Sequence, residues 1–328
     1  VPGKHSYMQN AGYPETRKAV AKTASAEQAV SIGENNIIMT TGAGGAMNIA
    51  LKAILNPGDT VLVPSPFFME YRFYADNHGA ELVPVQSAAG FEPDITALAA
   101  AVDERTAAVI INSPNNPTGA VYSENAIAEL GTMLDKKSRE TGRSIYLISD
   151  EPYRHIVFDG LTVPPVMKHY RNTIVATSYS KDLSIPGERI GWAAVHPEAD
   201  GGDELVAGMI LANRILGYVN APALMQRAAA RLQGEWVDAE IYRKKRDLLC
   251  DGLEKAGYEL TRPAGTFYLF LPAPGGDDEA FVEKLQKQLI LAVPGRGFGA
   301  PGYIRLSFCV ADEVISGAMP GFEAALNA

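Results

Sequence analysis

The chain has 328 residues, of which 47% are hydrophobic and 20% charged, and its formal net charge is −9. This composition is typical of a globular protein, and an acidic chain without a basic stripe argues against nucleic acid as its main partner. No apolar run reaches the roughly 18 residues of a membrane-spanning helix, and the first residues lack a signal-peptide core. Cys250 and Cys309 lie far apart, which favours two buried side chains in a reducing compartment over a disulfide. We therefore expect a cytoplasmic protein without a membrane segment.

In the first two thirds of the chain, short apolar runs alternate with helical patterns, which indicates an α/β sheet with crossover helices. Strands are predicted at 36–40, 60–63, 81–85, 107–112, 144–149, 172–177 and 190–195. Helices are predicted between them at 14–30, 45–55, 66–78, 95–101 and 123–141. Several strands are apolar almost throughout, as expected where both faces of a sheet are covered. Functional residues of such sheets gather in the loops beyond the strand C-termini.

The pattern changes near residue 231. A long helical stretch at 234–256 leads to short apolar runs at 258–260, 267–271 and 304–308, with a predicted helix at 278–289. We interpret residues 1–230 as a large domain and residues 231–328 as a smaller α+β domain.

Four segments with chemically useful residues follow predicted strands. The glycine-rich segment 40–46 would let backbone N–H groups approach an anion at a helix N-terminus, although alone it is equally a strand-to-helix turn. The segment 113–119, Ser-Pro-Asn-Asn-Pro-Thr-Gly, is by itself merely a good turn. Asp150 follows the predicted strand 144–149, in Ser-Asp-Glu-Pro-Tyr, although an acidic residue at a strand end is common by itself. Lys181 lies in a serine-rich loop after the strand 172–177, and Arg189 follows eight residues later.

Together and in this order, these segments resemble the fold-type I pyridoxal-phosphate enzymes, and within them the class I/II aminotransferases typified by aspartate aminotransferase. The resemblance runs from Tyr7 to the C-terminus, and its most specific block is Ser-Tyr-Ser-Lys-Asp-Leu-Ser-Ile-Pro-Gly-Glu-Arg-Ile-Gly, residues 178–191. It implies a large domain with a mostly parallel seven-stranded sheet and a smaller α+β C-terminal domain. The implied activity is transfer of the amino group of an L-α-amino acid to a 2-oxo acid by a ping-pong mechanism, with pyridoxal 5′-phosphate as cofactor and no metal.

The resemblance also assigns roles at the reacting centre. Lys181 is similar to the lysine that forms the Schiff base with the cofactor and later moves the proton of the substrate Cα. Asp150 is similar to the carboxylate that pairs with the pyridine nitrogen and keeps the ring an electron sink. Tyr153 and Asn116 match the pair that hydrogen-bonds the ring 3′-oxygen, and the bond from Asn116 to its proline is expected to be cis. Arg305, with Asn116 beside the substrate, matches the arginine that clamps the α-carboxylate.

The remaining family roles concern the cofactor phosphate, the ring and the partner subunit. The phosphate is expected to be held by Arg189, Ser178 and the backbone amides of Gly42, Ala43 and Gly44. Phe68 matches the aromatic side chain that stacks on the ring, with Phe67 as the alternative if the register is off by one. Tyr7 matches the tyrosine that reaches the phosphate from the neighbouring subunit, which implies a homodimer with shared active sites.

Some points stay open in the sequence. Family members carry several dozen residues before the Tyr7 region that complete the small domain, and the chain does not contain them. A second arginine for a dicarboxylate substrate cannot be assigned, since spacing supports none of Arg72, Arg214 and Arg296. The same cofactor shell would serve a β-C–S lyase or an aminocyclopropane-carboxylate-synthase-like lyase, and a third alternative is a cofactor-sensing domain without turnover.

Overall fold

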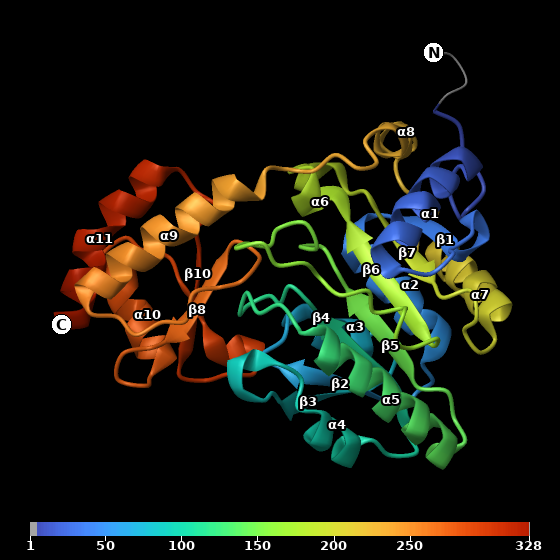
Figure 1. Ribbon diagram of the computed structural model, residues 1–328, viewed down its shortest axis with the longest axis horizontal. Coiled ribbons are helices and arrows are strands. Elements are labelled where there is room, and N and C mark those ends of the chain that lie inside the picture. The colour runs from blue at the N-terminus through green and yellow to red at the C-terminus, as the bar shows by residue number, and fades with distance from the viewer. Residues whose placement is uncertain (1–4, 328) are drawn as a thin grey trace.

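The computed structural model describes residues 5–327, and within them seven strands form one large sheet in the order β1-β7-β6-β5-β4-β2-β3 (Figure 1). The strands are β1 (Ile37–Thr40), β2 (Thr60–Ser65), β3 (Glu81–Gln86), β4 (Thr106–Asn112), β5 (Tyr146–Asp150), β6 (Thr173–Ser178) and β7 (Gly191–Val195). Strand β7 is antiparallel to both of its neighbours, and the other adjacent pairs are parallel. The mostly parallel seven-stranded sheet is therefore confirmed.

Helices cover both faces of this sheet, which explains why its central strands are apolar throughout. Ile110 of β4 shares one core with Met47 of α2 (Gly42–Ile54) and Met209 of α7 (Gly202–Ile215). Val109, the next residue along β4, faces the other way and packs with Leu130 of α5 (Glu124–Thr141). The same second face is covered by α4 (Ile95–Ala101) and, over β1 and β7, by α1 (Pro14–Gln28) and α8 (Ala223–Arg231). A short helix, α3 (Glu70–Asp76), follows β2.

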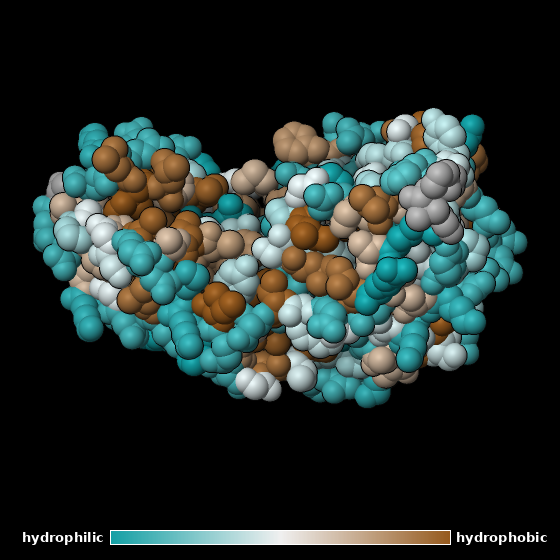
Figure 2. All heavy atoms as spheres, turned by 90° about the horizontal axis from the view of Figure 1, so that it is seen from above, coloured by the Kyte–Doolittle hydropathy of each residue, from teal (hydrophilic) through white to brown (hydrophobic). Residues whose placement is uncertain are grey.

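A second, three-stranded antiparallel sheet lies in the C-terminal part of the chain, at the left of Figure 1. Its strands are β8 (Tyr268–Pro272), β10 (Tyr303–Ser307) and β9 (Val293–Pro294), and it is accompanied by α9 (Ala239–Ala256), α10 (Asp278–Lys287) and α11 (Asp312–Asn327). Leu253, Leu285 and Ile304 lie in a separate core there. A notch separates the two lobes in Figure 2. We propose that the domain boundary lies in residues 232–238, called the connecting segment below, which join α8 to α9.

Several element boundaries differ from the prediction. The helix predicted at 66–78 begins only at Glu70, because the preceding residues bond to the C-terminal part: Ser65 Oγ donates to Gly299 O, and Phe67 N donates to Phe298 O. The helix predicted from 234 begins at 239, where the Asp238 side chain caps it. The helix predicted from 45 begins three residues earlier, at 42.

Other predictions from the pattern are wrong. The apolar run at 258–260 forms no strand, and the helices α7, α8 and α11 were not predicted. Cys250 is buried as expected, but Cys309 is exposed. It lies just beyond the end of β10, where the chain has left the small sheet, so its side chain is not covered by either core.

Candidate active site

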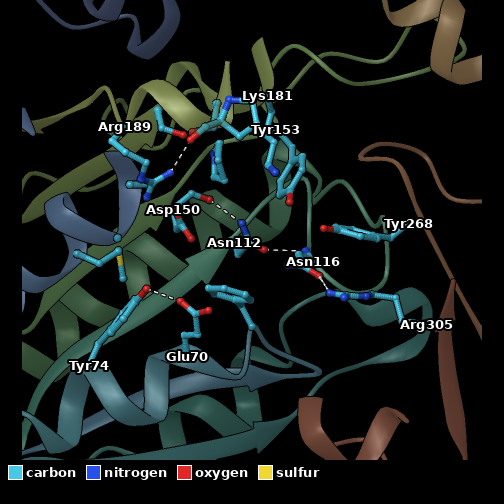
Figure 3. A pocket seen from close by; sticks show the side chains of 18 residues that line it. Glu70, Tyr74, Asn112, Asn116, Asp150, Tyr153, Lys181, Arg189, Tyr268 and Arg305 are labelled. Atoms are coloured by element: carbon cyan, nitrogen blue, oxygen red, sulfur yellow. Dashed lines mark hydrogen bonds between the residues drawn. The ribbon is translucent and has the colours of Figure 1, made fainter. Parts of the chain in front are cut away.

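The predicted site residues gather at one edge of the large sheet. Strands β2, β4, β5 and β6 are parallel, so their carboxyl ends lie along the same edge, and Arg189, two residues before antiparallel β7, lies at that edge too. A pocket of about 940 Å³, part of it open to solvent, lies there (Figure 3). Ten of the twelve predicted residues line it: Ala43, Gly44, Phe68, Asn116, Asp150, Tyr153, Ser178, Lys181, Arg189 and Arg305.

Asp150 presents one unsatisfied carboxylate oxygen at this pocket. It is the last residue of β5 and is buried, and its Oδ2 accepts a hydrogen bond of 2.6 Å from the hydroxyl of Tyr71. The other oxygen, Oδ1, is buried without a hydrogen-bond partner among residues 5–327. Burial raises the pKa of Asp150 to about 7. A buried acceptor of this kind fits a protonated ring nitrogen, which would supply the missing donor.

Lys181 lies in a single helical turn, α6 (Tyr179–Asp182), where the sequence predicted a loop. Its Nζ lies 5.1 Å from the ring centre of Phe267 and 5.9 Å from that of Tyr153. Burial lowers the pKa of Lys181, and the positive charges of Arg189 and Arg305 add to this effect. A larger fraction of the amine is therefore neutral and able to attack a carbonyl carbon.

An anion cradle lies at the N-terminus of α2. Its first turn contains Gly42, Ala43 and Gly44 and no acidic residue, and no side chain caps it, so backbone N–H groups stay free for a ligand. Gly42 has φ of +82°, and a Cβ there would lie 3.2 Å from Nη2 of Arg189, so a side chain would crowd the guanidinium. Gly42 itself does not line the pocket, but it lies directly against Arg189, whose charge and planar fork suit a phosphate.

Arg305 lies on the opposite wall of the pocket, on β10 of the small sheet (Figure 3). Its guanidinium lies 4.2 Å from the ring centre of Tyr268 and 4.7 Å from that of Phe298. Its Nη1 donates a 2.8 Å hydrogen bond to Oδ1 of Asn116. The bond between Asn116 and Pro117 is cis, as the resemblance implied. Two aromatic faces and one amide thus fix the orientation of a cation that can bind a carboxylate.

The aromatic candidates separate clearly. Phe68 lines the pocket, whereas Phe67 is fully buried in the core of the large sheet, so Phe68 is the one placed to stack on a ligand. Tyr153 is buried, and burial raises the pKa of its hydroxyl, which therefore stays protonated and able to donate. Tyr7 is 90% exposed and lies beside residues 218–223, away from the pocket of its own chain.

Sequence reasoning missed several pocket residues. Helix α3 contributes Glu70 and Tyr74, and the hydroxyl of Tyr74 donates to Oε2 of Glu70 at 2.6 Å. Tyr71 of the same helix does not line the pocket but is the hydrogen-bond partner of Asp150. Tyr268 of β8 is the aromatic neighbour of Arg305. No motif marked these residues. The available signal was the run of aromatic and acidic residues at 67–74; with the correct start of α3, positions 70, 71 and 74 fall on one face of the helix.

None of the three arginines considered for a second carboxylate lines the pocket. Arg296 is paired with the buried Asp278, Arg72 lies over the ring of Phe67, and Arg214 is exposed on α7. In the part of the chain that the structure describes, no helix is both long and apolar enough to cross a membrane. Nor does any group of three or more His, Cys, Asp or Glu between residues 5 and 327 have the arrangement of a metal site.

Comparisons with known proteins identify one family for the chain. The family model for class I and II aminotransferases matches residues 2–319. The aspartate/prephenate aminotransferase of Thermus thermophilus is 32% identical over 337 residues, covering 99% of this chain and 84% of the relative. The LL-diaminopimelate aminotransferase of Desulforudis audaxviator is also 32% identical, over 94% of this chain and 79% of its own. A crystal structure of an aminotransferase from Eubacterium rectale superposes with a TM-score of 0.96 at 43% identity, covering 99% of this chain and 82% of that one.

Proposed function

The chain belongs to the class I and II aminotransferase family and is a transaminase, and from that premise we propose that its pocket binds pyridoxal 5′-phosphate, with Lys181 as the attachment point. In this proposal the enzyme takes the amino group from an L-α-amino acid and passes it to a 2-oxo acid in two half-reactions. The observation that carries the proposal is the unpartnered Oδ1 of Asp150, buried in the pocket that Lys181 also lines.

The donor set fits this coenzyme at each end. Arg189, Ser178 and the first turn of α2 would hold its phosphate, because they combine positive charge with free N–H and O–H donors. Phe68 would cover one face of its ring, and Asp150 would pair with its ring nitrogen. When bound, the coenzyme supplies an aldehyde that condenses with amines and a ring that withdraws electrons from the substrate Cα.

The residues of this chain would then do three things to the substrate. Arg305, held by Asn116, binds the α-carboxylate and so fixes which bond at the Cα faces the ring. Lys181 would take the proton from the substrate Cα and deliver it to the carbon on the other side of the amino nitrogen, a task that its lowered pKa favours. Tyr153 and Asn116 would donate hydrogen bonds to the ring oxygen, and the buried Asp150 would keep the ring nitrogen protonated.

We also propose that the enzyme is a cytoplasmic homodimer. The exposed Tyr7 supports a shared site, because a tyrosine that cannot serve its own pocket is free to serve that of a second copy. Its hydroxyl would then be a further donor to the phosphate. The two cysteines without a disulfide support a reducing compartment.

The experiment that tests the function is an absorbance spectrum of the purified protein with pyridoxal phosphate, before and after adding single L-amino acids without an oxo acid. We expect a visible band that converts to the aminated form of the coenzyme with a restricted set of amino acids. A band that persists while pyruvate or a thiol accumulates would support the lyase alternative. A protein that gives no band would contradict coenzyme binding at this site.

A further inference from the structure

A cluster of charged side chains lies beside the turn that carries Lys181, and its centre is His155. The imidazole Nε2 lies 3.1 Å from Oε1 of Glu27 on α1, and Nδ1 lies 3.0 Å from Oδ2 of Asp182 on α6. The ring also stacks on the indole of Trp236, with centroids 4.1 Å apart and planes 5° apart. His155 thus has a carboxylate near each ring nitrogen and an indole on one ring face, although Nδ1 makes no hydrogen bond among the described residues and the side chain does not line the pocket of Figure 3.

The charges around His155 favour its protonated form. Burial alone would lower the pKa of His155, but the carboxylates of Asp182 and Glu27 outweigh burial and raise it to about 9. Arg154 is shared between two acidic residues: its Nη1 donates to Glu151 Oε2 at 2.8 Å, and its Nε lies 3.8 Å from Glu27 Oε2. The charged groups that line the small cavity around the imidazole are Glu27, Glu151, Arg154, Asp182 and Glu235. These are four carboxylates and one guanidinium. If the imidazole were neutral, Arg154 would be the only positive charge in the cavity lining to balance the four carboxylates.

The same cluster contacts both α6 and the connecting segment. Val237 N donates to the backbone oxygen of Asp182 at 2.7 Å, and Gln233 Nε2 donates to the hydroxyl of Tyr179 at 2.7 Å. Trp236 lies between these two donors in the chain. A helix of one turn is not stable by itself, because one turn fixes several dihedral angles for very few hydrogen bonds. The turn that carries Lys181 therefore depends on these tertiary contacts.

We infer that His155 is a positioning residue for Lys181, which joins the lysine turn to α1 and to the connecting segment. Glu27 pairs the imidazole with α1, which packs on the large sheet, and Asp182 pairs it with the turn that carries Lys181. Trp236 stacks the same ring on the connecting segment. A movement of the C-terminal part relative to the large sheet would reach Lys181 through this contact. The inference rests on the proposed role of Lys181, but the contact itself can be tested without coenzyme.

The structure offers a closely matched control. His169 also contacts a carboxylate, that of Glu124, and its side chain is 17% exposed, compared with 19% for His155. It precedes β6, at the opposite edge of the sheet from Lys181. We would compare His155→Gln with His169→Gln, and add Trp236→Leu, which removes the stacked ring but keeps both ion pairs. A fourth variant, Asp182→Asn, removes the charge that His155 holds.

Three measurements follow. The first is amide hydrogen exchange of residues 179–183 and 232–238 in the protein without coenzyme, which we expect to quicken in His155→Gln and Trp236→Leu but not in His169→Gln. The second is the pH at which the visible band of the coenzyme bound to Lys181 is half converted. We expect this midpoint to change in His155→Gln and to stay at the wild-type value in His169→Gln. The third is kcat, which we expect to fall on the order of tenfold to a hundredfold, as for other misplaced catalytic groups.

The pH dependence gives a further check. Because the folded pKa of His155 is raised, its contribution to stability is fully present below about 6.5 and is lost as the pH rises through about 9. The melting temperatures of wild type and His155→Gln should therefore differ at pH 6 and converge near pH 10.

The inference is overturned if His155→Gln and His169→Gln show the same hydrogen exchange and the same pH midpoint. A lower melting temperature of His155→Gln would then show only that His155 stabilises the fold. If His155→Gln does not fold, Trp236→Leu and Asp182→Asn must quicken exchange of residues 179–183, and the inference fails if they do not. A wild-type protein without any visible band would instead contradict the proposed function, while the exchange comparison would still decide whether His155 holds the turn.

Discussion

The hydroxyl of Tyr71, on α3, donates to Oδ2 of Asp150 across 79 residues of sequence, at 2.6 Å. This hydrogen bond fixes the carboxyl plane, so that the unpartnered Oδ1 has one defined orientation. Because the Tyr71 hydroxyl is a neutral donor, it does not neutralise the charge of the Asp150 carboxylate. Oδ1 can therefore still pair with a cationic ligand group. The geometry thus prepares Asp150 for a protonated ring nitrogen before any ligand is bound.

Asp150 should make stabilisation by the coenzyme depend on pH. Burial raises the folded pKa of Asp150 to about 7, so between about pH 4 and 7 the folded protein binds more protons than the unfolded chain and loses stability as the pH rises. A cationic partner removes this loss. We expect pyridoxal phosphate to raise the melting temperature more at about pH 8 than at about pH 5.5, measured by thermal unfolding.

The matched variant is Asp150→Asn, which keeps the shape and the Tyr71 contact but not the charge. Its gain in melting temperature should be smaller and nearly independent of pH, and its kcat should fall on the order of a hundredfold or more. An unchanged pH-dependent gain in Asp150→Asn would mean that another group provides the counter-charge.

Lys181→Ala should remove the visible band and lower turnover on the order of a thousandfold or more, because one residue serves as both attachment point and proton carrier. Burial lowers the pKa of Lys181, so the charged amine is less stable in the folded protein than in the unfolded chain. Removing this amine should therefore not lower the melting temperature of the coenzyme-free protein. Spectroscopy, steady-state kinetics and thermal unfolding check the three parts. Lys168→Ala, at an exposed ion pair with Glu124, is the control, and turnover retained by Lys181→Ala would refute the assignment.

Arg305→Lys should raise KM for amino acids about tenfold to a hundredfold with a smaller effect on kcat, because a lysine keeps the charge but loses the fork held between Tyr268 and Phe298. The informative comparison uses an amino acid and the amine that lacks its carboxylate. Wild type should prefer the amino acid strongly, and the variant should lose most of that preference. Equal KM values for the amino acid in wild type and variant would place the carboxylate elsewhere.

The charges of the pocket also predict which side chains it accepts. Its three cations, Lys181, Arg189 and Arg305, all have roles in the proposal, and Glu70 lines the same pocket, so no cation lining it is left for a second carboxylate among residues 5–327. We expect kcat/KM for asparagine to exceed that for the isosteric aspartate by roughly tenfold, about 1.4 kcal/mol.

Glu70→Gln should narrow this ratio, because it removes the like charge while it keeps an acceptor for Tyr74. A wild-type preference for aspartate would show that a cation from outside this pocket binds the second carboxylate.

The sequence predicted the strand-end residues well because two signals coincide there. Apolar runs buried on both faces mark the strands, and the polar residue that ends such a run, as Asp150 ends β5, must lie at the edge where the parallel strands finish. Lys181 was placed by the same reasoning, although the turn of helix around it depends on Asp182 and the connecting segment, which no local pattern reveals.

The parts that the sequence did not predict depend on distant contacts. Helix α3 was predicted to start at Pro66, and neither the place of Glu70 and Tyr74 in the pocket nor the contact of Tyr71 with Asp150 was predicted. The true start of α3 is set by bonds to residues 298 and 299. Helix α7 begins at Gly202, directly after Gly201, and α11 contains Pro320; glycine and proline are both unfavourable inside a helix, so the sequence indicated breaks there.

Tyr7 leads to the last prediction, which concerns the assembly. It is 90% exposed in its own chain, and the family resemblance places it at the phosphate of a second copy. If the sites are shared, a mixed dimer of Lys181→Ala and Tyr7→Ala chains contains one site with both defects and one site with neither. Mixing the two weakly active variants under conditions that exchange subunits should therefore restore activity, up to about a quarter of that of wild type when dimers reassort at random and each site works independently. Turnover of the mixture, with each variant alone as the control and the molar mass measured by light scattering, checks this. A mixture no more active than the sum of its parts, from a protein that is dimeric and exchanges subunits, would place Tyr7 outside the shared site.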